Sequence, residues 1–324
     1  MARKVLLDCD TGIDDAVAIA YAAAHPGIDL RAVGACWGNV DVERAAANSL
    51  HVLEVAGAAD VPVAVGARGP LDGRHPGFVP EVHGDTGRGR LPAATPEGRP
   101  VSVPAALQLI EVARAHPGEV TLVAVAPLTN VALALALEPT LPQLLAGVTV
   151  MGGAVTAPGN VTAAAESNAV RDPVAAQAVL SADWPVTLVP LDVTMTTLLE
   201  AEDLAALGRG GPLARYLGTI LEGYAGFYAA QVFGALRTPV HDVLALAVGA
   251  GTWPVRDALH AEVTVDTGDG PGRGQTLADL RGRYRTGPSA DGEARDTAGG
   301  QGVRIVQEVA DGFAGHLREV LGAG

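Results

Sequence analysis

Four carboxylates lie within eight residues near the start of the chain, in the segment Asp8-Cys9-Asp10-Thr11-Gly12-Ile13-Asp14-Asp15. The apolar run before this segment predicts a buried strand, and the alanine-rich run after it predicts a helix. Capping and the helix dipole explain one or two aspartates at a helix N-terminus. Four converging carboxylates would repel one another unless a cation lay between them. Because hard oxygen ligands favour Ca²⁺ or Mg²⁺, the segment predicts a divalent-metal site.

A second polar pair, His241-Asp242, precedes the apolar helical run Val243–Val248. Taken alone, the pair is expected to be an N-cap aspartate beside a solvated histidine. Taken with the first cluster, it could supply an acid group and a further metal ligand, since one loop does not provide enough ligands for the ion.

The elements that must position these groups alternate along the first half of the chain. This pattern predicts an α/β fold, with a mostly parallel (mixed) central sheet flanked by helices as in a Rossmann-like open sheet. Strands are expected at Lys4–Asp10, Leu30–Cys36, Val61–Val65, Val120–Val125, Val148–Met151 and Val186–Leu191. Helices are expected at Asp14–His25, Val42–Ala56, Val103–His116, Leu128–Leu137 and Asp172–Ser181.

The second half is expected to be mostly helical over Glu200–Gly249, with late strands at Ala261–Val265 and Val303–Glu308, a loop at Thr286–Gly302 and a last helix at Asp311–Leu321. No linker divides the chain convincingly, so residues 1–324 are expected to form one domain. Ligands of open parallel sheets bind beyond the carboxyl ends of the strands. Asp10, Asn39, the Val125 carbonyl and the Met151–Asn168 loop all follow predicted strands and are candidates for that edge.

Composition limits the partners and the compartment. The 324 residues are 48% hydrophobic and 18% charged, which is enough apolar surface for a core and excludes a disordered chain. A net charge of −14 argues against nucleic acid as a partner. No apolar run is long enough for a membrane span. The two cysteines, Cys9 and Cys36, exclude a disulfide scaffold, so a cytoplasmic protein is expected.

The ordered motifs resemble one known family. Asp8-Cys9-Asp10-Thr11-Gly12-Ile13-Asp14-Asp15-Ala16 is similar to the DxDxGxDDA signature of the inosine-uridine-preferring nucleoside hydrolases. Motifs similar to later ones of the family follow in its order: His83-Gly84-Asp85-Thr86-Gly87, Pro127-Leu128-Thr129-Asn130, Met151-Gly152-Gly153, Gly159-Asn160, Glu166-Ser167-Asn168, Asp172-Pro173, His241-Asp242, and Gly274-Gln275-Thr276 with Asp279.

The resemblance implies the nucleoside hydrolase fold, Ca²⁺-dependent hydrolysis of ribonucleosides, and a homodimer or homotetramer. Carried over by position, it implies that the calcium ligands are Asp10, Asp15, the Val125 carbonyl and Asp242. The residues that it implies hold the ribose are Asp14, Asn39, Asn160, Glu166 and Asn168. Met151 would pack under the sugar, and His83 and His241 would lie nearer the base.

The chemistry of N-glycosides completes this hypothesis. Cleavage of the C1′–N bond builds positive charge on the ribose ring. Calcium would bind the 2′- and 3′-hydroxyls and lower the pKa of a water, for which Asp10 would be the general base. His241 would protonate the leaving base, a task that suits the ordinary pKa of histidine.

Three departures from the family leave the preferred base open. Ser167 stands where an aromatic residue is frequent, Trp37 stands where a smaller residue is expected, and Ala126 replaces a glycine. His241 favours a site that accepts purines, and Tyr224 and Tyr228 are either base contacts or core residues.

Two rival functions stay open. Asp8-Cys9-Asp10-Thr11 also fits the nucleophile motif of haloacid-dehalogenase-like phosphatases, although Lys4, the single lysine, precedes that motif. The second rival is a non-catalytic nucleoside- or ribose-binding protein.

Overall fold

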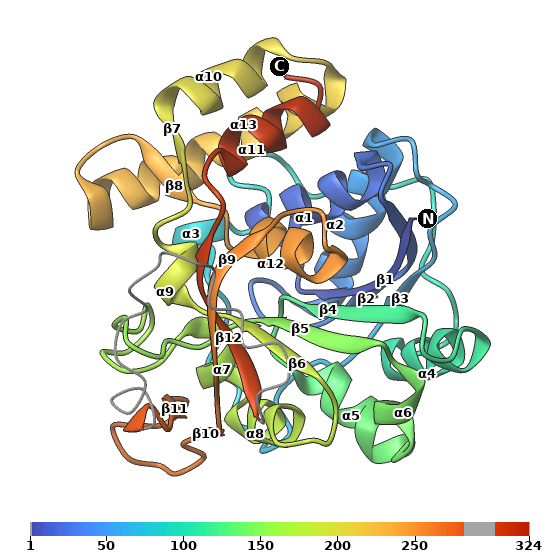
Figure 1. The fold of residues 1–324 in the computed structure, drawn as a ribbon. Coiled ribbons are helices and arrows are strands. Elements are labelled where there is room, and N and C mark those ends of the chain that lie inside the picture. The colour runs from blue at the N-terminus through green and yellow to red at the C-terminus, as the bar shows by residue number, and fades with distance from the viewer. Residues whose placement is uncertain (1, 282–301, 324) are drawn as a thin grey trace.

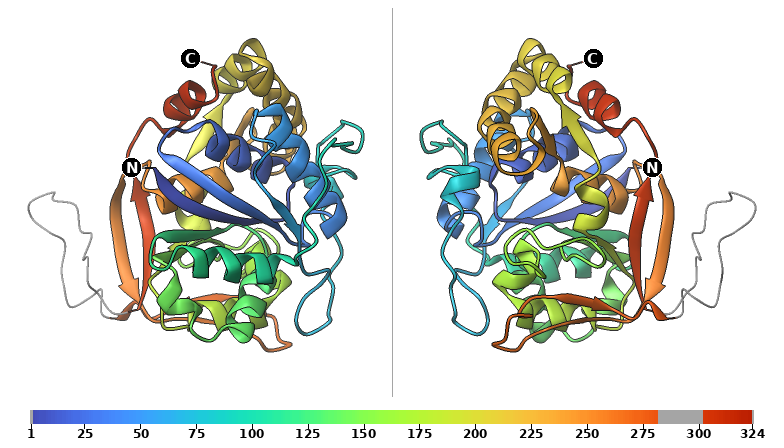
Figure 2. Two further views of the ribbon diagram at one scale, coloured as in Figure 1. Left: turned by 90° about the vertical axis from the view of Figure 1, so that its right-hand side faces the viewer. Right: turned by 90° about the vertical axis from the view of Figure 1, so that its left-hand side faces the viewer.

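An eight-stranded sheet runs through the centre of the molecule (Figure 1). The computed structural model describes residues 2–281 and 302–323. The strand order is β3-β2-β1-β4-β5-β6-β12-β9, and every neighbouring pair is parallel except β12 and β9. Figure 2 shows the antiparallel pair at one edge of the sheet. The strands are β1 (Arg3–Cys9), β2 (Ile28–Ala35), β3 (Val63–Val65), β4 (Val120–Ala124), β5 (Gly147–Met151), β6 (Val186–Val189), β9 (Val255–Ala261) and β12 (Val303–Val309).

This order confirms the predicted mixed, mostly parallel sheet and explains where the site forms. The chain proceeds from β1 outward to β3 and then returns to β4, which pairs with the other side of β1. Such a reversal opens a crevice beyond the carboxyl ends of the two central strands. Asp10 follows β1 and Val125 follows β4, so both lie at the reversal.

Each face of the sheet has its own apolar core. One core packs the sheet against α1 (Ile13–Ala24), α2 (Val42–Val55), α11 (Pro212–Tyr228) and α12 (His241–Ala250). The other packs it against α4 (Ala105–Ala115), α5 (Thr129–Leu137), α6 (Leu141–Leu144) and α8 (Pro173–Leu180). Because both faces are covered, the central strands are buried along nearly their whole length, which is why they read as continuous apolar runs.

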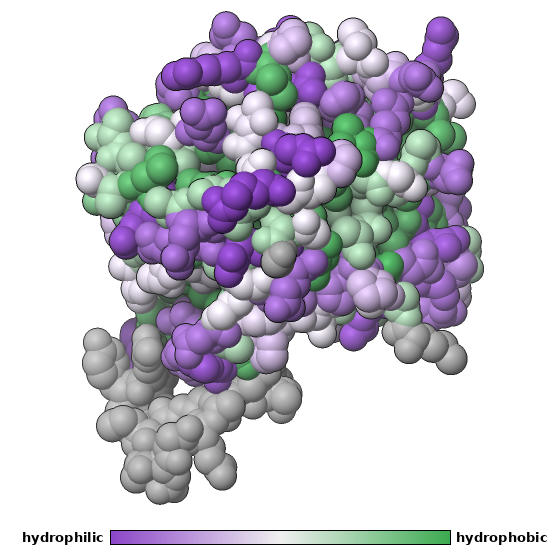
Figure 3. Space-filling view, turned by 90° about the horizontal axis from the view of Figure 1, so that it is seen from above, coloured by the Kyte–Doolittle hydropathy of each residue, from purple (hydrophilic) through white to green (hydrophobic). Residues whose placement is uncertain are grey.

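Short elements surround this framework. The remaining helices are α3 (Pro80–His83), α7 (Ser167–Arg171), α9 (Leu191–Thr194), α10 (Ala201–Arg209), the π-helix η1 (Ala229–Phe233) and α13 (Phe313–Val320). Two small antiparallel sheets pair β7 (Leu198–Glu200) with β8 (Arg237–Pro239) and β10 (Val263–Val265) with β11 (Thr276–Ala278). Seen from above, hydrophilic residues cover much of the face near α10 and α13, with hydrophobic residues between them (Figure 3).

Two expected strands differ from the structure, and one strand was not expected. The expected strand Ala261–Val265 is two strands, because β9 ends at Ala261 and β10 belongs to another sheet. The sequence analysis missed the start of β9 at Val255, since this edge strand carries polar residues. The expected strand Val186–Leu191 ends at Val189, before Pro190. Residues 286–301 of the expected loop lie outside the described residues.

The described residues bear on the helices long enough for a membrane and on the two cysteines. In that part of the chain, no helix combines the length and the apolar character needed to cross a membrane. Cys9 and Cys36 are both buried and are not joined in a disulfide.

Candidate active site

The turn from β1 into α1 is held by the carboxylate of Asp15. Its Oδ1 accepts a hydrogen bond from the Asp10 amide at 3.1 Å, and its Oδ2 accepts one from the Gly12 amide at 2.9 Å. Gly12 is required here because a Cβ would lie 2.4 Å from His83 Nδ1. Asp15 therefore fixes the backbone that carries the other acidic residues.

Asp10 contacts Asn39, a residue that borders the site. Its Oδ2 accepts a hydrogen bond from the Asn39 amide at 2.6 Å, and its Oδ1 accepts one from Asn39 Nδ2 at 3.2 Å. A Cβ at Gly38 would lie 1.9 Å from Asp10 Oδ2, so only glycine allows this approach. Burial raises the pKa of Asp10 to about 7. The carboxyl group is thus held in one orientation by donors on a single neighbour.

Three buried carboxylates form a compact acidic group. Among the described residues, Asp14, Asp15 and Asp242 each present an oxygen within 4.8 Å of the other two. Burial, followed by the charges on Asp14 and Asp15, raises the pKa of Asp242 well above its usual value. Burial and the charge on Asp10 raise the pKa of Asp15 in the same way. The structure thus brings together Asp14, Asp15 and Asp242, whereas Asp10, which was also predicted as a carboxylate ligand, is not in this group.

The donor set of this acidic group fits a hard cation. Asp14 Oδ1 is buried and has no hydrogen-bond partner among the described residues. This oxygen is therefore available to bind a cation. The Val125 carbonyl also borders the pocket, and it accepts one hydrogen bond, from Asn168 Nδ2 at 2.9 Å. A carbonyl oxygen has a second lone pair for a further partner. Carboxylate and carbonyl oxygens are the ligands that Ca²⁺ prefers.

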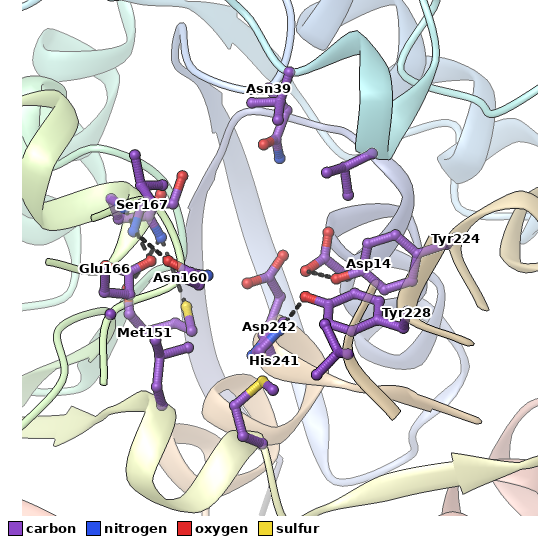
Figure 4. Close-up of a pocket in the computed structure, with 18 of the residues that line it drawn as sticks. Asp14, Asn39, Met151, Asn160, Glu166, Ser167, Tyr224, Tyr228, His241 and Asp242 are labelled. Carbon is purple, nitrogen blue, oxygen red and sulfur yellow. Dashed lines mark hydrogen bonds between the residues drawn. The ribbon is translucent and has the colours of Figure 1, made fainter. Parts of the chain in front are cut away.

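These groups lie at one pocket of about 630 Å³ (Figure 4). Every residue predicted for the site lines this pocket except Asp10 and Asp15, which lie behind its wall. The predicted residues that line it are Asp14, Asn39, His83, Val125, Met151, Asn160, Glu166, Asn168, His241 and Asp242. Residues from both halves of the chain therefore converge at the carboxyl edge of the sheet.

One wall of the pocket is polar and built by the loop that follows β5. Glu166 caps α7 and accepts hydrogen bonds from the Gly153, Asn168 and Ala169 amides at 2.9, 2.9 and 3.1 Å. Asn168 Nδ2 donates to the Val125 and Met151 carbonyls, at 2.9 and 3.2 Å. These bonds make the wall rigid, so its polar atoms hold fixed positions for a ligand.

The opposite wall is aromatic and comes from α11. Tyr224 donates a hydrogen bond to Asp14 Oδ2 at 3.0 Å, and the Tyr228 hydroxyl lies 3.0 Å from His241 Nε2. Phe227 on α11 and Gln231 on the following π-helix η1 also line the pocket, and neither was predicted from the sequence. They follow Tyr224 by three and seven residues, which is the spacing of one helix face and could have indicated them. A helix face that packs in the core has the same spacing, so the pattern alone does not identify a pocket.

The two histidines of the pocket are neutral at pH 7. Burial lowers the pKa of His83 to about 3, and His83 Nδ1 accepts a hydrogen bond from the Ile13 amide at 3.1 Å. Burial lowers the pKa of His241 to about 4. His241 Nδ1 lies 2.7 Å from Thr194 Oγ1, so both of its ring nitrogens contact hydroxyl groups. The expectation that His241 keeps the ordinary pKa of histidine was therefore wrong, because its side chain is buried.

Two of the sequence departures lie outside the pocket lining. Trp37 is fully buried, and its Nε1 donates to Thr129 Oγ1 at 3.1 Å. It packs in a small apolar cluster with Cys36 and Ala126. Ser167, by contrast, lines the pocket beside Glu166. Of the three departures, Ser167 is the one that a ligand would meet directly.

Asp8, the nucleophile in the phosphatase hypothesis, is not part of the pocket lining. It is buried, and its Oδ1 accepts a hydrogen bond from Asn130 Nδ2 at 2.8 Å. The same Asn130 side chain donates to the Ala35 carbonyl at 3.0 Å and accepts from the Ala67 amide at 2.8 Å. Asp8 and Asn130 thus connect the loops beneath the site, and the geometry does not favour a phosphoryl transfer to Asp8.

The fold and this site define a class of protein. A family model described as inosine-uridine preferring nucleoside hydrolase matches residues 5–312. The chain belongs to this family, and it is a nucleoside hydrolase that acts on ribonucleosides, which confirms the resemblance drawn from the motifs.

Two relatives of similar sequence have names that give uridine or pyrimidine nucleosides as substrates. The chain is 37% identical over 231 residues to "Probable uridine nucleosidase 2" of Arabidopsis thaliana, covering 68% of this chain and 70% of the relative. It is 36% identical over 248 residues to "Pyrimidine-specific ribonucleoside hydrolase RihA" of Citrobacter koseri, covering 76% and 79%.

Solved structures are similar over nearly the whole chain. A plant nucleoside hydrolase, the PpNRh1 enzyme, has a TM-score of 0.89 at 30% identity and covers 100% of both chains. A purine-preferring ribonucleoside hydrolase from Gardnerella vaginalis has a TM-score of 0.85 at 26% identity and covers 98% of this chain and 96% of that chain.

Proposed function

We propose that this enzyme hydrolyses the N-glycosidic bond of ribonucleosides to free base and ribose with the help of Ca²⁺. The observation that carries the proposal is the group of three buried carboxylates, Asp14, Asp15 and Asp242, two of which (Asp14 and Asp242) line a pocket with one polar and one aromatic wall. Such a group gains most from a cation and from a substrate that becomes positively charged during the reaction.

The proposed calcium ligands are Asp10, Asp15, the Val125 carbonyl and Asp242, and the acidic group adds Asp14 as a further candidate. When bound, Ca²⁺ supplies positive charge that orients the ribose hydroxyls and makes a nearby water more acidic. The polar wall then holds the sugar through Asn160, Glu166 and Asn168, with Asn39 on the side of Asp10 and with Met151 under the ring.

Asp10 is the proposed general base for the attacking water. Its two hydrogen bonds from Asn39 keep the carboxyl group in one orientation, so no reorganisation precedes the proton transfer. As the bond to the base breaks, positive charge develops on the ribose ring. The carboxylates around the sugar stabilise that charge.

The leaving base is proposed to take its proton from the aromatic wall. His241 is neutral, and its two nitrogens contact the hydroxyls of Tyr228 and Thr194. His241 would take up a proton from solvent and pass one to the leaving base through the Tyr228 hydroxyl that contacts its Nε2. The proton that the attacking water gives to Asp10 would return to solvent, so the protons balance. His83, on the same side of the pocket, would contact the base.

The test is a panel of ribonucleosides. With Ca²⁺ present, we expect the purified enzyme to release reducing sugar from inosine, uridine or both, because the aromatic wall offers ring faces that suit either class of base. The same preparation is expected to release no phosphate from p-nitrophenyl phosphate. Reducing-sugar and phosphate assays measure the two products. Release of phosphate without free base would support the phosphatase, and binding of nucleosides without any cleavage would support the binding protein.

Two further expectations accompany this function. We expect a homodimer or homotetramer and a cytoplasmic location, as the family resemblance and the cysteine content indicate. Neither bears on the chemistry of the pocket.

A further inference from the structure

The late motif Gly274-Gln275-Thr276 lies outside the active-site pocket. It belongs to the antiparallel pair of β10 and β11, which is separate from the central sheet (Figure 1). Thr276 begins β11, and its side chain is buried. Among the described residues that line the pocket, none comes from this motif. The motif can therefore influence a ligand in the pocket only through the residues that it holds in place.

The Thr276 hydroxyl binds both polar atoms of the Ala154 backbone. Its Oγ1 accepts a hydrogen bond from the Ala154 amide at 2.9 Å and donates one to the Ala154 carbonyl at 2.8 Å. A hydroxyl can do both at once, because it has one donor site and two acceptor sites. Ala154 is buried, so the hydroxyl satisfies polar atoms that the fold keeps largely away from water.

The preceding residue, Gly153, connects this contact to Glu166. The Gly153 amide donates to Glu166 Oε2 at 2.9 Å, and the Gly153 carbonyl accepts from the Leu191 amide at 2.9 Å. Gly153 has a φ of +76°, and a Cβ there would lie 2.8 Å from Thr276 Cγ2. Glycine is therefore required both by the backbone conformation and by the close approach of Thr276. Any shift of Ala154 would also move the amide that holds Glu166.

The pair of β10 and β11 is itself fixed against the helices of the polar wall. A Cβ at Gly274 would lie 2.4 Å from Val170 Cα, so the backbone before β11 packs directly on α7. Val265 is paired with Thr276 across the two strands, and its amide donates to Gln177 Oε1 on α8 at 2.6 Å. These contacts hold Thr276 in one position relative to α7, the helix that Glu166 caps.

We propose that Thr276 is a positioning residue, whose hydroxyl fixes the Gly153–Ala154 turn and thereby the orientation of the Glu166 carboxylate. The inference rests on the proposed function, in which Glu166 holds the ribose. Three amides orient this carboxylate, and the Gly153 amide is the one that does not belong to α7. If the turn moves, the carboxylate is held from the α7 side alone and can rotate away from the sugar.

A double-mutant cycle tests whether Thr276 acts through Glu166. With Ca²⁺ present, kcat/KM for uridine and inosine is measured for wild type, Thr276→Val, Glu166→Gln and the double variant. Thr276→Val keeps the size of the side chain and removes both bonds to Ala154, so we expect kcat/KM to fall about 10- to 100-fold as the carboxylate loses its position. In the Glu166→Gln enzyme, the same substitution is expected to lower kcat/KM less than about threefold, because the carboxylate that it would misplace is already gone.

Two further variants separate positioning from a general loss of structure. Thr276→Ser keeps the hydroxyl and is expected to keep kcat/KM within about threefold of wild type. Thr264→Val removes an exposed hydroxyl from β10 of the same strand pair and is expected to change kcat/KM less than about twofold. Thermal unfolding shows whether each variant is folded at the assay temperature. If Thr276→Val is not folded, Thr276→Ala takes its place in the cycle.

The outcomes distinguish this inference from the proposed function. If wild type cleaves no ribonucleoside, the proposed function fails. If wild type cleaves them, the inference is supported when the hydroxyl-free variant is slow, Thr276→Ser is not, and the effect largely disappears in the Glu166→Gln enzyme. An equal loss in the wild-type and Glu166→Gln enzymes, or no loss in either, would mean that Thr276 does not act through Glu166.

Discussion

Replacement of Asp10 with alanine is expected to lower kcat for ribonucleoside hydrolysis by at least about a thousandfold, because a general base contributes roughly 10²–10⁴ to the rate. The change also removes one proposed calcium ligand, so the loss falls in the upper part of that range. Asp15, on the same turn, is not free to replace Asp10, since its carboxylate is already bonded to the Asp10 and Gly12 amides. The measurement is kcat for reducing-sugar release at saturating Ca²⁺.

A remote aspartate provides the matched control. Asp183 is exposed and lies between α8 and β6, at the end of the strands opposite to the pocket. Asp183→Ala is expected to keep kcat within about twofold of wild type. If Asp10→Ala retained more than a tenth of the wild-type kcat while folding normally, Asp10 would not be the general base.

Replacement of Asp242 with asparagine is expected to have opposite effects on activity and on the stability of the metal-free protein. The new amide side chain would offer the cation a neutral oxygen, so calcium affinity and activity should fall by at least about a hundredfold. Without metal, the substitution removes repulsion from the nearby carboxylates of Asp14 and Asp15. We therefore expect the Tm of the chelated variant to exceed that of chelated wild type by about 1–3 °C.

Activity assays and thermal unfolding in chelator test both halves of this result. Asp311→Asn changes an exposed carboxylate next to α13 and should leave calcium affinity and activity unchanged. A variant at Asp242 that lost stability in chelator would contradict the account of a repulsive acidic group. If the variant kept the calcium affinity of wild type, Asp242 would not be a calcium ligand.

Much of the fold could be predicted because the sheet is buried on both faces. Strands such as β4 and β5 are mostly apolar and almost completely buried, so they can be distinguished from the helical runs on either side. Edge strand β9 lacks such an apolar run, and its partner β12 lies much later in the chain. The position of the site followed from strand ends, because side chains after parallel strands meet at one edge.

The details of the site depended on burial and packing, which the sequence does not reveal. Asp14 was expected to hold ribose only, and its closeness to Asp242 required the packing of α1 against α12. His241 was expected to titrate near neutrality, but burial lowers its pKa to about 4. Phe227 could not be distinguished from a core residue, since a helix facing a pocket has the same period as one facing a core.

The central claim is that the acidic group of Asp14, Asp15 and Asp242 binds a cation on which cleavage of ribonucleosides depends. The most direct measurement combines calcium content and product release in wild type before chelation, after chelation and after Ca²⁺ is restored. We expect about one calcium ion per chain, no reducing sugar after its removal, and full recovery when it returns. Undiminished release of base and ribose from the calcium-free, chelated enzyme would contradict the claim.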